Sequence, residues 1–142
     1  GNYIYLHFVC RGIMHQVKEK IIDEIRSLNL SQIEWRQPYS DNQLLALRRS
    51  LDLFDELIEE HLGNWGLRDY PDVLIDKARS LRLLGRYNEA HECLLEAYNL
   101  EFRNLEVYMG MIGLYRQMGA IDCAGNWMCS YIDQLYADQR LQ

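Results

Sequence analysis

Proline is scarce in this chain: 2 of its 142 residues are proline and 9 are glycine. Because proline interrupts helices and glycine weakens them, this scarcity favours an ordered, mostly helical chain over a disordered one. Hydrophobic residues make up 49% of the sequence. At this length, such a chain can bury a substantial core, so the composition predicts a folded domain.

An excess of basic residues is also missing. The sequence has 15 Lys and Arg against 21 Asp and Glu, which gives a formal net charge of −6. Proteins that bind nucleic acid usually present a basic field, so this segment is not expected to bind nucleic acid. No long hydrophobic run occurs either. The apolar run at 3–10 is eight residues long and ends at Arg11, too short to span a bilayer, so no membrane association is expected.

The four cysteines form no CxxC pair and no Cys/His cluster with metal-ligand spacing; they lie at positions 10, 93, 123 and 129. A disulfide framework would be unusual for a chain with this core content. The pattern is typical of reduced, packed thiols in a cytoplasmic protein. We therefore expect a cytoplasmic location and neither a metal nor a cofactor.

Catalytic motifs are absent from the sequence. There is no phosphate-binding loop, no nucleophile elbow and no HExxH motif. The histidines at 7, 15, 61 and 91 are scattered along the chain, which is more typical of structural or surface residues than of ligands. The sequence predicts no catalytic residues and no enzymatic activity.

The N-terminal part is expected to form two helices. Apolar residues at 9, 13, 17, 21 and 25 make one stripe along a helix, or a bent pair of helices, over 3–28. The apolar first turns at 3–9 must be covered by the chain or by a partner. A second helix is predicted to begin with a capping box at Ser40 and Gln43 and to end at Gly63. The acidic end of that helix, at 55–60, is either a solvated face or a docking patch for a basic segment.

A local frame occurs twice in the C-terminal half. The stretch Leu-Gly-Arg-Tyr-Asn-Glu-Ala at 84–90 returns as Met-Gly-Ala-Ile-Asp-Cys-Ala at 118–124. The shared glycine and alanine are the residues that a tight helical hairpin needs, one for a left-handed turn and one for a close crossing. Two consecutive units of equal length, 71–104 and 105–138, are therefore predicted to form helical hairpins.

This pattern resembles the tetratricopeptide repeat. The positions that carry the resemblance in the first unit are Leu74, Ala78, Leu81, Ala90, Leu94 and Ala97, and in the second Tyr108, Met111, Tyr115, Ala124 and Met128. The second unit departs from the family at Ile112 and Tyr131, and neither unit closes with proline. The resemblance implies an all-α fold of antiparallel hairpins stacked as a short right-handed solenoid. We expect a single domain over 1–142, with N-terminal helices, or a degenerate hairpin, at 1–63 and two repeats at 71–138. Trp65 is expected to pack beneath the first repeat.

Members of this family usually hold a peptide or a partner helix in a groove lined by the first helix of each repeat. In this chain the register assigns that groove to Asp72, Ile75, Asp76, Arg79, Arg82, Leu83, Glu106, Met109, Gly113, Arg116 and Gln117. Arg79, Arg82 and Arg116 would form a basic stripe, and guanidinium groups suit carboxylates. The alternative is that these arginines pair with acids of the chain itself. The Lys/Asn clamp of some family members is missing, because its positions hold Ile75, Arg79 and Gly110.

The last helix, predicted over 122–137, is more apolar than a terminal helix normally is. Its candidate interface residues are Trp127, Tyr131 and Leu135. A second copy of the chain, a partner or further repeats would cover them. The resulting hypothesis is a non-catalytic protein–protein interaction module that binds a peptide or partner helix. The alternatives are a regulatory or dimerisation domain of a larger bacterial signalling or transcription protein, and a secretion-chaperone-like protein.

Overall fold

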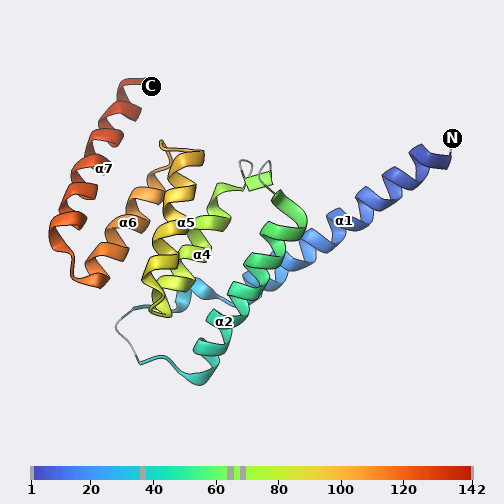
Figure 1. Ribbon diagram of the computed structural model, residues 1–142, viewed down its shortest axis with the longest axis horizontal. Helices are drawn as coiled ribbons and strands as arrows, with labels where there is room; N and C mark the ends of the chain where they lie inside the picture. Colours follow the sequence, from blue (N-terminus) through green and yellow to red (C-terminus); the bar gives the residue numbers. More distant parts are fainter. Residues whose placement is uncertain (1, 36–37, 64–65, 68–69, 142) are drawn as a thin grey trace. The chain divides into compact units, whose positions relative to one another are not determined.

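The computed structural model describes residues 2–35, 38–63, 66–67 and 70–141; for 2–11 and 140–141 it describes the backbone only. Over these residues the fold is all-α, as predicted. The elements are α1 (Asn2–Ser27), η1 (Leu30–Gln32), α2 (Asp41–Glu56), η2 (Leu57–Leu62), α4 (Pro71–Leu83), α5 (Tyr87–Leu100), α6 (Leu105–Met118) and α7 (Ile121–Leu141) (Figure 1). The chain divides into two compact units, Gly1–Gly66 and Leu67–Gln142. The boundary falls in the connection between the predicted N-terminal helices and the predicted repeats.

In the first unit, α1 is one continuous helix, and the capping box at the start of α2 is confirmed. The Ser40 hydroxyl accepts from the Gln43 N–H at 3.1 Å, and the Ser40 N–H donates to the Gln43 side chain at 2.9 Å. Two nitrogens of Arg49 donate to Glu24 at 2.9 and 3.1 Å and so join α2 to α1. The exposed pair orients two helices but contributes little stability.

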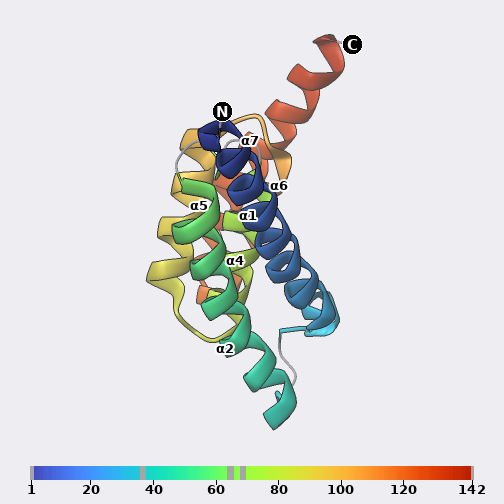
Figure 2. The same ribbon diagram turned by 90° about the vertical axis from the view of Figure 1, so that its right-hand side faces the viewer.

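The apolar stripe of α1 is covered less than expected. Ile21 is buried, whereas Ile13, Met14 and Val17 are exposed. Figures 1 and 2 show why: the C-terminal part of α1 runs beside α2, and its N-terminal part extends beyond it. On α2 the buried side is fuller and includes Leu47, Leu51, Leu53 and Phe54.

The second unit consists of two antiparallel hairpins, α4–α5 and α6–α7. Pro71 begins α4, a position where its missing N–H costs nothing. The first helices of the two hairpins begin at 71 and 105, and the second helices begin at 87 and 121. The two first helices start as far apart in the sequence as the similar stretches at 84–90 and 118–124, and so do the two second helices. The hairpins therefore repeat with the period that the sequence predicted.

Both hairpins turn on a glycine with a left-handed backbone. Gly85 and Gly119 each have φ of 79°. The residue after each glycine donates its N–H to the carbonyl five residues back, Arg86 to Leu81 and Ala120 to Tyr115, both at 2.8 Å. This is the Schellman arrangement, which satisfies carbonyls left open at a helix end. The predicted role of the two glycines is confirmed.

The core of the second unit contains most of the motif residues named from the sequence, whereas Tyr115 is half-buried and Met128 is exposed. Its buried residues include Leu74, Ala78, Leu81, Ala90, Leu94, Ala97, Val107, Tyr108, Met111, Leu114 and Ala124. Gly110 allows α6 to approach α5 closely, because a Cβ there would lie 2.7 Å from Leu94 Cδ2. Small residues at the crossing thus set the distance between the hairpins.

Two predictions fall outside what the structure describes. They are the packing of Trp65 and the covering of the apolar side chains at 3–9. Among the described residues, none of the helices combines the length and the hydropathy that crossing a membrane would require.

Candidate functional site: the groove between α4 and α6

The groove that the register predicted is present in the second unit. The α4–α6 groove, as we call it, has a volume of about 220 Å³ and is lined by Ile75, Asp76, Ala78, Arg79, Arg82, Leu94, Glu106, Met109 and Gly110. The residues predicted for it that do line it are Ile75, Asp76, Arg79, Arg82, Glu106 and Met109. Its floor is apolar, since Ala78 and Leu94 are 2% exposed, and its walls carry both signs of charge.

Arg82 is held in place by α6. Its Nη1 donates to Gln117 Oε1 at 2.9 Å, and Gln117 Nε2 donates back to the Arg82 carbonyl at 3.2 Å. Gln117 also donates to the Tyr87 hydroxyl at 3.3 Å. Of the two alternatives for this arginine, binding a partner or pairing within the chain, the structure shows pairing with a neutral amide. Gln117, which was itself predicted for the groove, supports its wall through Arg82.

Asp76 lies in the groove with a perturbed acidity. Desolvation by the surrounding residues is the main cause, and with the negative charge of Asp72 it raises the pKa of Asp76 to about 6; Arg79 opposes this shift. Asp76 is nevertheless exposed to solvent. As the pH falls through about 6, Asp76 takes up a proton and loses its negative charge, so the groove becomes more positive.

Four further residues predicted for the groove lie elsewhere. Leu83 is 3% exposed and cannot contact a partner, so its assignment to the groove was wrong. Ser80 is also buried, and residues three apart share a helix face. Ser80 and Leu83 follow the exposed Asp76 at i+4 and i+7, so the C-terminal part of this face of α4 is covered while its N-terminal part is open. Asp72 and Arg116 are exposed but do not line the groove. Gly113 lies against the Arg82 guanidinium, because a Cβ added at Gly113 would be 3.7 Å from Arg82 Cζ.

The residues predicted for an interface on α7 are partly covered. Trp127 is half-buried and packs edge-to-face on Tyr98 and Tyr108, with ring centroids 5.8 and 5.7 Å apart. Tyr131 and Leu135 are half-buried as well. The exposed apolar residues of α7 are instead Ile121, Met128, Ile132 and Tyr136. Trp127 thus turns toward the hairpin, and each of the exposed residues Met128, Ile132 and Tyr136 directly follows one of the three predicted residues in the sequence.

The aromatic trio borders a second hollow of about 490 Å³, lined by Tyr98, Tyr108, Asn126, Trp127, Ser130, Asp133, Gln134 and Ala137. Several of its polar groups already bond within the unit. The Tyr108 hydroxyl donates to the Phe102 carbonyl at 2.8 Å, Ser130 to the Asn126 carbonyl, and Gln134 to Asp138. The sequence did not single out this hollow, because its members come from three helices.

Cysteine placement differs in part from the expectation of packed thiols. Cys93 is buried, whereas Cys123 and Cys129 are exposed on α7, and all three are free. In the part of the chain that the structure describes, one group of side chains has ligand atoms close enough together for a metal ion, Glu56, Glu60 and His61. It lies in the first unit and not in the groove.

Searches of protein-family models, of curated proteins and of solved structures each returned no match for this chain. The geometry of the chain itself is therefore what supports an inference about its function.

Proposed function

We propose that the second unit is a non-catalytic binding module of the tetratricopeptide type, which holds a peptide or partner segment in the α4–α6 groove. The observation that carries this proposal is that Arg79 and Arg82 of α4 line the same groove as the exposed Met109 of α6. A guanidinium beside an apolar side chain suits a segment with a carboxylate next to an apolar residue. The repeat register and the two glycine turns support the family assignment.

The size of the groove favours a segment of a larger partner over a whole small molecule. Pockets for drug-sized ligands usually have volumes of roughly 300–1,000 Å³, and this groove has about 220 Å³. That volume suits one or two side chains of an extended peptide. The free thiols of Cys93, Cys123 and Cys129 fit a reducing compartment, and we place the protein in the cytoplasm.

A peptide selection tests the proposal. The full chain would be immobilised and panned against a random peptide library, and the enriched peptides measured by fluorescence polarisation. We expect acidic–apolar sequences, and we expect Arg79→Glu to weaken their affinity at least about tenfold through charge repulsion. Arg103→Glu is the matched control, because Arg103 is exposed and lies outside the groove lining. No enrichment, or equal losses in both variants, would contradict the proposal.

A second candidate function is dimerisation through α7, as in a regulatory domain. The exposed row Ile121, Met128, Ile132 and Tyr136 favours it, because contiguous apolar surface of this kind commonly marks an interaction site. Light scattering at increasing protein concentration would show a dimer that Ile132→Asp abolishes. A monomer at every concentration would remove this candidate.

A further inference from the structure

The end of the second helix winds in an unusual way. From Leu57 to Leu62 the chain forms a π-helix, and the Gly63 N–H donates to the Ile58 carbonyl, five residues back. In an α-helix, residues five apart point about 140° away from each other, because each residue turns the helix by about 100°. The wider π-turn brings such residues back to one face, and π-turns are frequent at functional sites.

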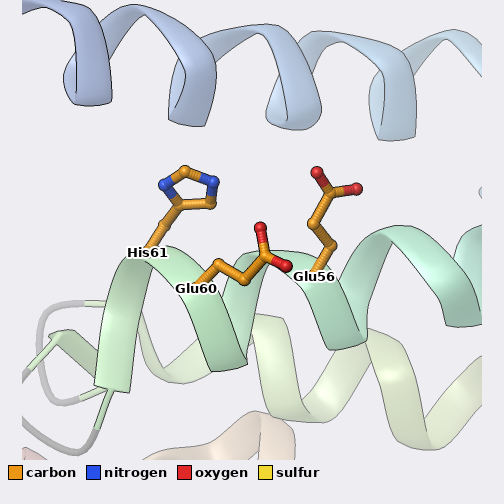
Figure 3. A group of neighbouring side chains, drawn as sticks. All are labelled: Glu56, Glu60 and His61. Atoms are coloured by element: carbon orange, nitrogen blue, oxygen red, sulfur yellow. The ribbon is translucent and has the colours of Figure 1, made fainter.

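The wide turn gathers three metal-ligating side chains. Glu56, Glu60 and His61 stand at positions i, i+4 and i+5, and one ligand atom of each lies within 4.8 Å of the others. Figure 3 shows the three side chains on the same side of the helix, with the imidazole ring and the two carboxylates directed toward the neighbouring α1. The group could not be found from α-helical spacing, since residues 56 and 61 would then diverge.

The histidine supplies an independent observation. His61 Nε2 is buried, and among the described residues it has no hydrogen-bond partner. A buried polar atom that lacks a partner is rare in native proteins and calls for an explanation, of which a bound ion is one. In Figure 3 the ring of His61 lies beside Glu60 and on the same side as Glu56. A ring nitrogen of His61 is thus placed within 4.8 Å of an oxygen of each of the two carboxylates.

We propose that Glu56, Glu60 and His61 bind a divalent transition-metal ion, with Zn²⁺ as the best match. One imidazole nitrogen and two carboxylate oxygens are donors that Zn²⁺ accepts at about 2.0–2.2 Å, and a water completes four-coordination. Two such ligands on a tetrahedral ion stand about 3.4 Å apart. The present spacing therefore needs only a small rotation of the side chains, and Glu60 is exposed and free to make it. The nitrogen donor disfavours Ca²⁺ and Mg²⁺, which select oxygen ligands.

The charges of the site fit the same ion. Two carboxylates balance the charge of one divalent cation, and the cation in turn relieves the repulsion between Glu56 and Glu60. The exposed Glu59 belongs to the same π-helix but is not a member of the group. It gives the chain a matched control: the same residue type, in the same turn, without the proposed contact.

Titration of the chelator-treated 142-residue chain with Zn²⁺ alone would test the site. We expect saturable binding of one ion, and we expect Glu56→Gln and Glu60→Gln each to weaken the affinity at least about tenfold, while Glu59→Gln changes it less than about twofold. Mg²⁺ at the same concentration should produce no saturable signal. The Glu60→Gln variant keeps an exposed side chain of the same shape, so it should fold normally.

Because Zn²⁺ can also bind exposed thiols, the titration would be followed by NMR of the histidine side chains. Binding at the proposed site should shift the imidazole signals of His61, and the shift should saturate at the same Zn²⁺ concentration as the titration. In the His61→Gln variant the saturable Zn²⁺ binding itself should be lost. The proposal is overturned if the His61 signals do not move. It is equally overturned if Glu56→Gln and Glu59→Gln bind Zn²⁺ alike.

Discussion

The two hairpins of the second unit share a register but differ in how much of them is covered. Ala90 of the first and Ala124 of the second occupy the same position in the repeat, and both are buried. At the next motif position the two hairpins differ, because Leu94 of the first is 2% exposed whereas Met128 of the second is 49% exposed. α5 buries Ala90, Cys93, Leu94 and Ala97; on α7, Ala124 is the buried one among the described side chains.

The difference shows that a repeat frame determines the turn but not the environment of a helix. α5 contacts both α4 and α6, whereas the contacts of α7 in this unit are mainly with α6. A helix with neighbours on two sides buries two faces, and a terminal helix buries one. The first helices of the two hairpins differ as well, in the residues that they bring to the α4–α6 groove. α4 supplies Asp76 and Arg79, whereas the residues at the matching positions of α6 are Gly110 and Gly113.

The largest expected effect comes from truncating the paired motif positions. Leu94→Ala should lower the free energy of unfolding by about 2–5 kcal/mol, because it leaves a cavity in a packed core. Met128→Ala should cost less than about 0.5 kcal/mol, because its side chain is half in water. Denaturant unfolding measures both. A comparable cost at both positions would break the contrast and show that α7 is covered in solution.

The two turns should respond alike. An added Cβ at Gly85 or Gly119 meets nothing within 4 Å, so strain at φ of 79° is the expected cost of an alanine. We expect Gly85→Ala and Gly119→Ala each to lower the free energy of unfolding by about 1 kcal/mol. Thermal unfolding of the pair checks this. A clear difference between the two losses would show that the turns are not equivalent.

Asp76 gives the smallest predicted effect and depends on pH. Its folded pKa of about 6 lies above the ordinary value of 3.8, so the folded state favours the protonated acid, and this contribution to stability is lost as the pH rises through 6. Asp76→Asn should therefore raise stability at pH 8 by less than about 1 kcal/mol, since solvent still reaches the group. Below pH 4 the gain should vanish.

Unfolding curves of Asp76→Asn and of the parent chain at pH 4, 6 and 8 test this dependence. Gly110→Asn, at the matching position of α6, is not a suitable control, because Leu94 leaves no room there. Asp72→Asn is the more useful companion variant, because Asp72 is exposed on the same helix and its charge is one cause of the raised pKa of Asp76. It should reproduce a fraction of the effect. A gain that does not change with pH would contradict the altered pKa.

Local interactions made much of the fold predictable. The capping box at Ser40 and Gln43 depends on residues three apart, and the turns at Gly85 and Gly119 depend on one backbone angle each. The groove was found in part, because Ile75, Arg79 and Arg82 recur on one side of a single helix. Leu83 was misplaced, because periodicity identifies the face of α4 but does not reveal that the C-terminal part of this face is covered.

The sequence by itself determined the all-α fold, the start of α2 and the glycine turns that the two hairpins share, because these follow from short-range spacing and from the conformations open to glycine. Only the tertiary structure decided which apolar residues of α7 face the hairpin and that Arg82 bonds Gln117. It also decided that a π-turn gathers Glu56, Glu60 and His61. The physical reason is that exposure and contact depend on neighbouring helices, whose positions no local pattern encodes.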